Sequence, residues 1–291
     1  MSSEAAAQVL ALITSLLYAS ALVSARAGMR SSNPSTVTLV SILMQNAILW
    51  TAVLVTGAPH SVPIAGLLLF VAVGIFQLGV RLFAYTGVAK IGASRSSALQ
   101  AVSPLVSATI AILALGEQTS RLIVLGTFLV VVGIILVSWK PEQQLPGFRR
   151  WHLLLPLAAA FLTGINHPIR RYVLTIANEP LFFSALMGTV SLAGFLVYLP
   201  FSPTSLRLVW NRQAILPFLA TGLCETLSIL FIITAISLGR VVIIAPIAAS
   251  YPVWSLILGW FLLRHAEPVS WKTVAGVLSV VGGNFAIHLG R

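Results

Sequence analysis

The sequence predicts an all-α integral membrane protein with ten transmembrane helices arranged as two inverted five-helix repeats. The first observation is composition: of 291 residues, 58% are hydrophobic and only 8% are charged, whereas a soluble domain carries about 25% charged residues. The second is that the apolar residues form ten runs, each close to the roughly 20 residues that a helix needs to cross a bilayer. The third is an internal repeat, in which polar residues and glycines of the first half recur in the second.

The ten apolar runs follow one another closely and leave little of the chain for a soluble domain. They are residues 5–25, 36–56, 64–89, 94–115, 122–139, 153–169, 180–199, 214–238, 241–263 and 269–288. Continuous apolar runs indicate helices, since barrel strands alternate between apolar and polar residues. The loop at residues 140–150 separates the halves, so we predict one repeat over residues 1–145 and an inverted repeat over residues 146–291. Because little of the chain remains for a soluble domain, we expect the function to lie within the membrane.

Spans three and eight carry the clearest part of the repeat. Span three recurs 148 residues later in span eight, with Gly74, Gln77, Phe83 and Thr86 matching Gly222, Glu225, Phe231 and Thr234. The following spans continue the repeat, with Pro104 matching Pro252 at 148 and with Glu117, Gly126 and Gly133 matching Glu267, Gly276 and Gly283 at 150. Because each copy has five spans, an odd number, the second copy enters the membrane from the opposite side. Inverted repeats are typical of secondary transporters, whose two halves alternate around a central site.

The basic residues indicate membrane topology and not nucleic acid binding. The chain has 17 Lys and Arg against 6 acidic residues, a net charge of +11, but the basic residues fall singly or in pairs between apolar runs. Their excess at one set of loops predicts that both termini lie outside. The first apolar run lacks a basic leader and is too long for a signal peptide, so we expect it to remain as a helix. The single cysteine, Cys224, excludes an internal disulfide.

Two charged side chains lie inside predicted spans, Arg81 in span three and Glu225 in span eight. A charge at the bilayer centre costs about 3 kcal/mol on insertion scales, so it should face the bundle interior or a wet cavity. We expect Glu225 to line a central cavity with its repeat counterpart, Gln77, opposite it. Two interpretations of Glu225 stay open: a carboxylate that takes up a proton or binds an amine, and a protonated acid that ties helices together by a hydrogen bond.

Spans four and nine each contain a proline beside a polar helix face. Gln100, Ser103 and Ser107 follow one another at i, i+3 and i+7 and so share a face. Pro104 and its counterpart Pro252 each free a backbone carbonyl about one turn earlier, which a substrate could meet. Small residues on such a face equally suit close helix packing, so both binding and packing stay open.

The remaining candidates are polar and aromatic residues in spans one, three, six and nine. Tyr251 and Trp254 lie beside the second proline, where an aromatic ring can stack on a ligand. His167 follows Asn166 in a polar cluster at the predicted end of span six, and it either titrates near neutral pH or caps the kinked helix. The complete predicted substrate-binding set is Tyr18, Gln77, Arg81, Tyr85, Gln100, Ser103, Asn166, His167, Glu225, Tyr251 and Trp254.

Several chemistries have no supporting motif. The sequence contains no Gly-Lys-Ser/Thr phosphate loop, no His-Glu-x-x-His metal motif and no aspartate for an intramembrane dyad. We therefore expect no catalytic residue, enzyme activity, cofactor or metal ion. A channel should show rings of charge, and an enzyme a catalytic cluster confined to one half, so a secondary carrier is the leading interpretation. A full internal duplication could form the pathway within one chain, which favours a monomer.

The repeated region resembles a known transporter signature. The stretch Gly92-Ala-Ser-Arg-Ser-Ser-Ala-Leu, followed by Pro104, Leu115-Gly-Glu117, Gly126 and Gly133, is similar to the EamA-type half of the drug/metabolite transporter superfamily. The second copy runs Gly239, Pro252, Glu267, Gly276 and Gly283. This resemblance implies a ten-helix carrier in the inner membrane of a bacterium, with a small-molecule substrate.

The resemblance extends to amino-acid exporters. The chain departs from the family pattern at two places. The size and aromatic content look most like exporters of amino acids, including aromatic ones, with export of drugs or other metabolites as the alternative. Family members commonly carry Trp-Gly in the first helix of each half, where this chain has Tyr18-Ala19 and Thr163-Gly164. The second copy also reads His265-Ala-Glu267 in place of Leu-Gly-Glu.

Overall fold

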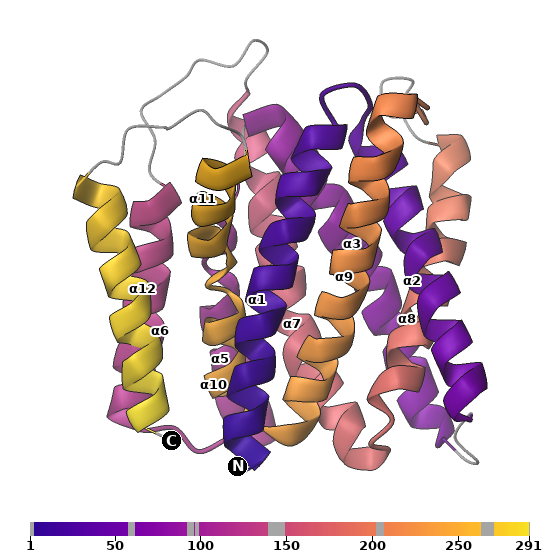
Figure 1. Ribbon diagram of the computed structural model, residues 1–291. Helices are drawn as coiled ribbons and strands as arrows, with labels where there is room; N and C mark the ends of the chain where they lie inside the picture. The colour runs from indigo at the N-terminus through magenta and orange to yellow at the C-terminus, as the bar shows by residue number, and fades with distance from the viewer. Residues whose placement is uncertain are drawn as a thin grey trace.

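The protein is a bundle of α-helices (Figure 1). The computed structural model describes residues 3–57, 62–91, 96, 99–138, 149–201, 207–262 and 271–290. Within these ranges, nine helical stretches are long and apolar enough to cross a membrane, and a shorter apolar helix lies in the predicted fourth span. The all-α membrane fold is therefore confirmed. Residues 140–148 of the predicted loop at 140–150 and the repeat residues Gly92 and Glu267 lie outside the described residues.

The helices follow the ten predicted spans. Those of the first half are α1 (Ser3–Gly28), α2 (Pro34–Thr56), α3 (Ile64–Ile91), α5 (Ser103–Leu115) and α6 (Arg121–Ser138). Those of the second half are η1 (Arg150–Leu153), α7 (Leu154–Ile176), α8 (Pro180–Tyr198), η2 (Leu199–Phe201), α9 (Arg212–Leu238), α10 (Val241–Ala248), α11 (Tyr251–Leu262) and α12 (Trp271–Leu289).

Local capping residues set several helix boundaries. The Asn33 side chain accepts a hydrogen bond from the Thr36 backbone N–H at 3.0 Å and so caps the start of α2. Asn211 caps α9 in the same way, through the backbone N–H of Gln213 at 2.9 Å. Helix α5 ends at Gly116, whose φ of +65° is a left-handed conformation that favours glycine.

The fourth and ninth spans are interrupted at equivalent places. In the ninth span α10 ends at Ala248, residues 249–250 form a turn, and α11 begins at Tyr251. In the fourth span residues 99–100 are helical, residues 101–102 form a turn, and α5 begins at Ser103. Both turns lie two residues before a proline, Pro104 or Pro252, which has no backbone N–H to donate to the preceding turn. The predicted disturbance of the helix backbone is therefore present in both repeats.

The prediction that span six ends at residue 169 is wrong. Helix α7 continues to Ile176 with Pro168 inside it, so Arg170 and Arg171 lie within the helix. Both arginines have partners in the bundle: Arg170 donates to a side chain of α3, and Arg171 donates to the carbonyl oxygens of Ile236 at 2.8 Å and of Ser237 at 3.1 Å. A hydropathy pattern places the end of a span at such charged residues, because it carries no information about the distant residues that pair with them.

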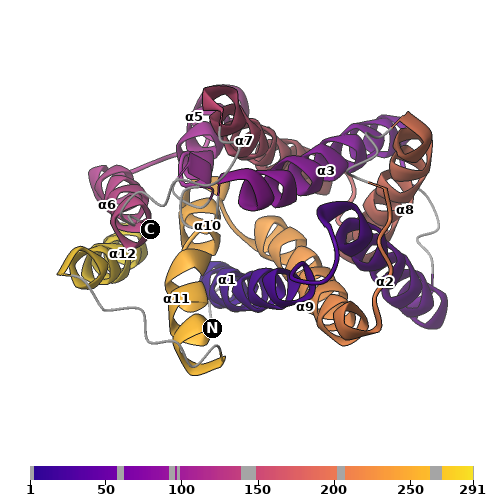
Figure 2. The same ribbon diagram turned by 90° about the horizontal axis from the view of Figure 1, so that it is seen from above.

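The two halves interlock, since the first helix of each packs against the third of the other. Helix α1 packs against α9, α7 packs against α3, α2 packs against α8 and α6 packs against α12. Viewed from above, α6 and α12 lie together at one edge of the bundle and α2 and α8 at the other (Figure 2).

The first helices of the two halves run in opposite directions. Both chain termini lie at the same end of the bundle (Figure 1). Helix α1 begins at that end, where the Ser3 hydroxyl donates to the carbonyl of Leu238 at the end of α9. Helix α7 finishes there, because Arg171 contacts the same end of α9 through Ile236. This arrangement is the inverted repeat that the odd number of spans predicts.

The contact between α6 and α12 has the pattern of a twofold axis. A Cβ atom added to Gly126 would lie 2.5 Å from the carbonyl oxygen of Gly283, and one added to Gly133 would lie 2.7 Å from that of Gly276. The repeat pairs Gly126 with Gly276 and Gly133 with Gly283. Each glycine therefore faces the counterpart of the other, as two antiparallel elements related by a twofold axis require.

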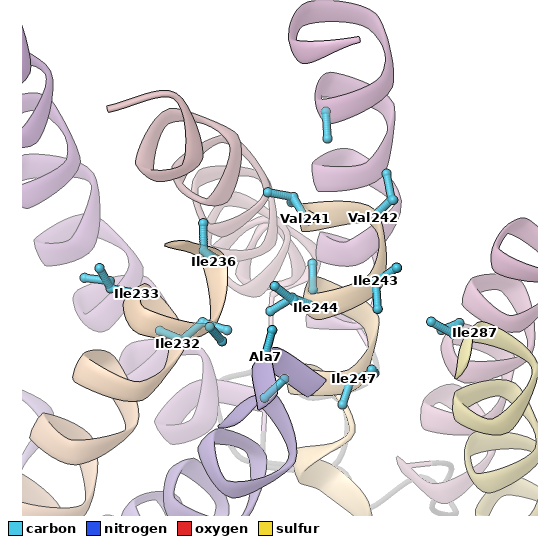
Figure 3. Close-up of a cluster of buried hydrophobic side chains, with 14 of the residues drawn as sticks. Ala7, Ile232, Ile233, Ile236, Val241, Val242, Ile243, Ile244, Ile247 and Ile287 are labelled. Carbon is cyan, nitrogen blue, oxygen red and sulfur yellow. The ribbon is translucent and has the colours of Figure 1, made fainter. Parts of the chain in front are cut away.

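A large apolar cluster fills the end of the bundle at which the termini lie. Figure 3 shows Ala7 of α1 beside Ile232 and Ile236 of α9 and Ile244 of α10. All four side chains are nearly or completely buried. Buried apolar side chains therefore fill this part of the bundle, and the polar residues described next lie further along the helices.

Candidate functional site

A buried ion pair joins the two halves of the protein. The Nε atom of Arg81 on α3 donates to Oε1 of Glu225 on α9 at 2.7 Å, and the two side chains are only 2% and 3% exposed. The hydroxyl of Tyr85, one turn further along α3, donates to Oε2 of Glu225 at 3.3 Å. Both carboxylate oxygens of Glu225 therefore have a partner, as a charge buried in a bundle requires.

Gln45 extends this network to two more helices. Its Oε1 atom accepts from Nη2 of Arg81 at 2.7 Å, and its Nε2 atom donates to the carbonyl oxygen of Ser184 on α8 at 3.0 Å. Gln45 is completely buried on α2. Gln45 is absent from the predicted set, although an amide in the middle of an apolar span could have indicated it.

A second arginine lies beside this network without a carboxylate. Arg170 on α7 donates from Nη2 to Oε1 of Gln77 at 2.7 Å and to the sulfur of Met187 at 3.4 Å. Gln77 lies one turn before Arg81 on α3, so the two guanidinium groups occupy neighbouring positions. Arg170 is buried, and no ion pair within the described part of the chain includes it. The predicted set did not contain Arg170, because its span was expected to end before it.

Gln77 was expected to lie opposite Glu225 across a central cavity, and in the structure each of the two side chains has its own partner. The two repeat counterparts do not pair with each other: Glu225 accepts from Arg81, whereas Gln77 accepts from Arg170. Each therefore contacts an arginine supplied by the other half. The part that Gln77 and Glu225 play in transport stays a prediction.

Two tyrosines pack together close to the ion pair. The rings of Tyr18 on α1 and Tyr251 on α11 meet edge to face, with centroids 4.8 Å apart and an interplanar angle of 89°. Tyr18 is near enough to Glu225 and Arg81 to experience the charge of both. Tyr251 is the first residue of α11, and Trp254 follows one turn later, both half-buried. The helix break in the ninth span thus places aromatic side chains near the charged centre.

The remaining predicted residues divide into two groups. Gln100 donates to the hydroxyl of Ser96 at 3.1 Å, and Ser103 begins α5; both are half-buried. No hydrogen bond among the described residues joins them to the ion pair. Asn166 and His167 lie on α7 beside Arg170 and are 1% and 8% exposed. The amide atoms of Asn166 and Nδ1 of His167 have no hydrogen-bond partner among the described residues.

The chain matches a family of membrane transporters twice. The profile of the EamA-like transporter family matches residues 5–139 and again residues 150–289. No curated protein matches the chain. One solved protein crystal structure covers 98% of this chain and 97% of its own, with a TM-score of 0.78 at 18% identity, a similarity that shows the fold. Since the two profile matches span nearly the whole sequence, this multi-pass, non-enzymatic secondary transporter belongs to the EamA-like transporter family.

Proposed function

We propose that this transporter exports amino acids, including aromatic and apolar ones, across the inner membrane of a bacterium by alternating access. The observation that carries the proposal is the proximity of both signs of charge to an aromatic pair. Arg81 and Glu225 lie near the ring contact of Tyr18 with Tyr251, and Arg170 lies beside Arg81 on the other side of Gln77. An amino acid has a carboxylate, an ammonium group and a side chain, and these need a cation, an anion or amide oxygen, and an apolar surface respectively.

The inverted architecture supports alternating access around this centre. Equivalent halves of opposite direction can exchange two shapes about one site. Buried apolar side chains of α1, α9 and α10 fill the bundle near the end where the termini lie. A substrate would therefore reach the charged centre from the opposite end, and release toward the termini would require α9 and α10 to move apart.

A broader exporter of drugs or other metabolites is the second candidate. The half-buried rings of Tyr18, Tyr251 and Trp254 favour it, since aromatic surfaces also accept apolar solutes that carry no charge. Transport of uncharged aromatic solutes at rates equal to those of amino acids would support this alternative.

The test is counterflow of labelled amino acids in liposomes that contain only this protein. We expect saturable uptake of at least one amino acid that exchanges with unlabelled substrate inside, and no uptake in protein-free liposomes. Flux that rises linearly without saturation would indicate a channel. Absence of flux for every amino acid would contradict the proposed substrate class.

The role of Glu225 can be tested with E225Q across a pH series. We expect transport to fall by about tenfold or more, because the variant removes the anionic partner of Arg81 from the centre. The matched control is E179Q, which neutralises a carboxylate at the start of α8. An unchanged rate and pH profile in E225Q would remove Glu225 from the mechanism.

A further inference from the structure

Arg170 has an unusual set of partners for a buried cation. Its guanidinium contacts a neutral amide oxygen at 2.7 Å and a thioether sulfur at 3.4 Å, while its Nε atom is buried without any acceptor. A thioether is a weak acceptor, and a buried charge normally has a charged partner. The site therefore offers strong donors that no anion of the described chain uses.

Unpartnered polar atoms continue along the same face of α7. Asn166 lies four residues before Arg170 and His167 three, so all three side chains fall on one side of the helix. Both amide atoms of Asn166 and Nδ1 of His167 are buried without hydrogen bonds. Buried polar atoms are nearly always paired in native proteins, so this group is completed by something other than the described chain.

The charges around this face do not balance. Among the described residues the centre contains two guanidinium groups, Arg81 and Arg170, but one carboxylate, Glu225, which is held by Arg81 and Tyr85. The two arginines are close enough to repel each other. One more negative charge beside Arg170 would neutralise the excess and relieve that repulsion.

We propose that Arg170 and Asn166 bind the carboxylate of the transported substrate, an inference that rests on the proposed function for the identity of that substrate as an amino acid. Nε of Arg170 and Nδ2 of Asn166 donate to the two carboxylate oxygens. Oδ1 of Asn166 is left to accept from the neighbouring ammonium group. Half-buried Gln77, which accepts from the same guanidinium, orients Arg170 and forms the accessible side of the site.

A carboxylate fits this site better than a spherical anion does. Guanidinium N–H groups point in fixed directions that match two oxygens in a plane, and an amide donor one turn away adds a further fixed direction. A chloride ion would use the charge of Arg170 but not this geometry. The proposal therefore predicts discrimination between an amino acid, its carboxamide and chloride.

The first experiment measures ligand binding to the purified full-length protein by the shift of its thermal unfolding midpoint. Phenylalanine, phenylalaninamide, acetate and sodium chloride are titrated against the wild type, R170Q and R170K. We expect the two carboxylates to stabilise the wild type, with a half-saturation concentration that rises about tenfold or more in R170Q and less in R170K. The amide and chloride should give no saturable shift.

The matched control is R171Q, which changes the adjacent arginine on α7. Arg171 donates to the carbonyl oxygens of Ile236 and Ser237, so its loss affects helix packing and should leave the carboxylate titration unchanged. Ligand-free R170Q should unfold at or above the wild-type temperature, because it removes an uncompensated buried charge. A lower midpoint for R170Q than for R171Q, or equal stabilisation by amide, chloride and carboxylate, would overturn the proposal.

The second experiment separates this inference from the proposed function. Counterflow is measured with labelled phenylalanine and, in parallel, with its carboxamide. Equal rates of flux for both compounds would support amino-acid transport as the function. The same result would contradict the proposal that Arg170 and Asn166 bind the substrate carboxylate. No amino-acid flux, together with carboxylate stabilisation that R170Q abolishes, would reject the amino acid as substrate and leave Arg170 as the binding residue for another organic acid.

Discussion

The internal duplication is preserved in the contact between α6 and α12 but not in the charged centre on α3, α7 and α9. At α6–α12 the repeated residues face each other in twofold-related pairs, Gly126 with Gly283 and Gly133 with Gly276. In the charged centre the repeat is broken, since Ile229 occupies the position equivalent to Arg81. Repeated glycines thus pack α6 against α12, whereas the two members of the buried ion pair, Arg81 and Glu225, have uncharged counterparts, Ile229 and Gln77. A duplicated scaffold can therefore present an asymmetric site to an asymmetric solute.

The largest effect should follow from breaking the ion pair of the charged centre. R81Q leaves the carboxylate of Glu225 buried without a cation, so we expect the free energy of unfolding to fall by about 3–5 kcal/mol. Denaturant unfolding of the purified protein in detergent micelles measures this loss.

The double variant R81Q/E225Q is the control for that prediction. It removes both charges and should recover a clear part of the stability lost in R81Q. If the double variant is no more stable than R81Q, the pair is not the source of the loss.

A smaller effect should follow from disturbing the symmetric scaffold. In G133A the added Cβ would lie 2.7 Å from the carbonyl oxygen of Gly276, so the two helices must separate, at a cost of about 1–3 kcal/mol. G283A changes the repeat counterpart and should cost the same, because its Cβ would lie 2.6 Å from the carbonyl oxygen of Gly126. Thermal unfolding of both variants tests the twofold pattern directly.

Gly282 supplies the matched control on the same helix. A Cβ added there has nothing within 4 Å, and alanine is the better helix former, so G282A should be neutral or stabilise by up to about 1 kcal/mol. Unequal losses in G133A and G283A, or a loss in G282A of similar size, would contradict the symmetric packing.

The smallest effect concerns a repeated carboxylate. Glu117 accepts from the backbone N–H groups of Val241 at 2.9 Å and Val242 at 3.0 Å and so caps the start of α10. E117Q keeps one acceptor and loses the charge that favours a helix N-terminus, so we expect a loss of about 1 kcal/mol in thermal unfolding and unchanged selectivity in counterflow. An effect as large as that of R81Q would show that Glu117 belongs with the charged centre.

Several features of the fold were predictable because they depend on residues near each other in the chain. Pro104 and Pro252 predicted the disturbed fourth and ninth spans, since a proline affects its own turn of helix. The apolar runs located the spans, since crossing a bilayer depends on local length and polarity. The end of span six was mispredicted for the converse reason, as Arg170 and Arg171 are held in the bundle by residues distant in sequence.

The site was predicted only in part. Glu225, Arg81 and Tyr85 could be selected as polar residues in apolar spans, but their mutual contact could not. Gln45 and Arg170 were missed because their importance comes from the partners that packing brings to them.

The sequence by itself determined that this chain spans the membrane, that it is duplicated, and that each copy has an odd number of spans, which forces inversion. Only the tertiary structure decided which charges are paired. Arg81 meets a carboxylate 144 positions away, whereas the partners of Arg170 among the described residues are neutral. The physical reason is that hydropathy and repeat spacing act along the chain, whereas electrostatic pairing depends on distances between atoms that only helix packing sets.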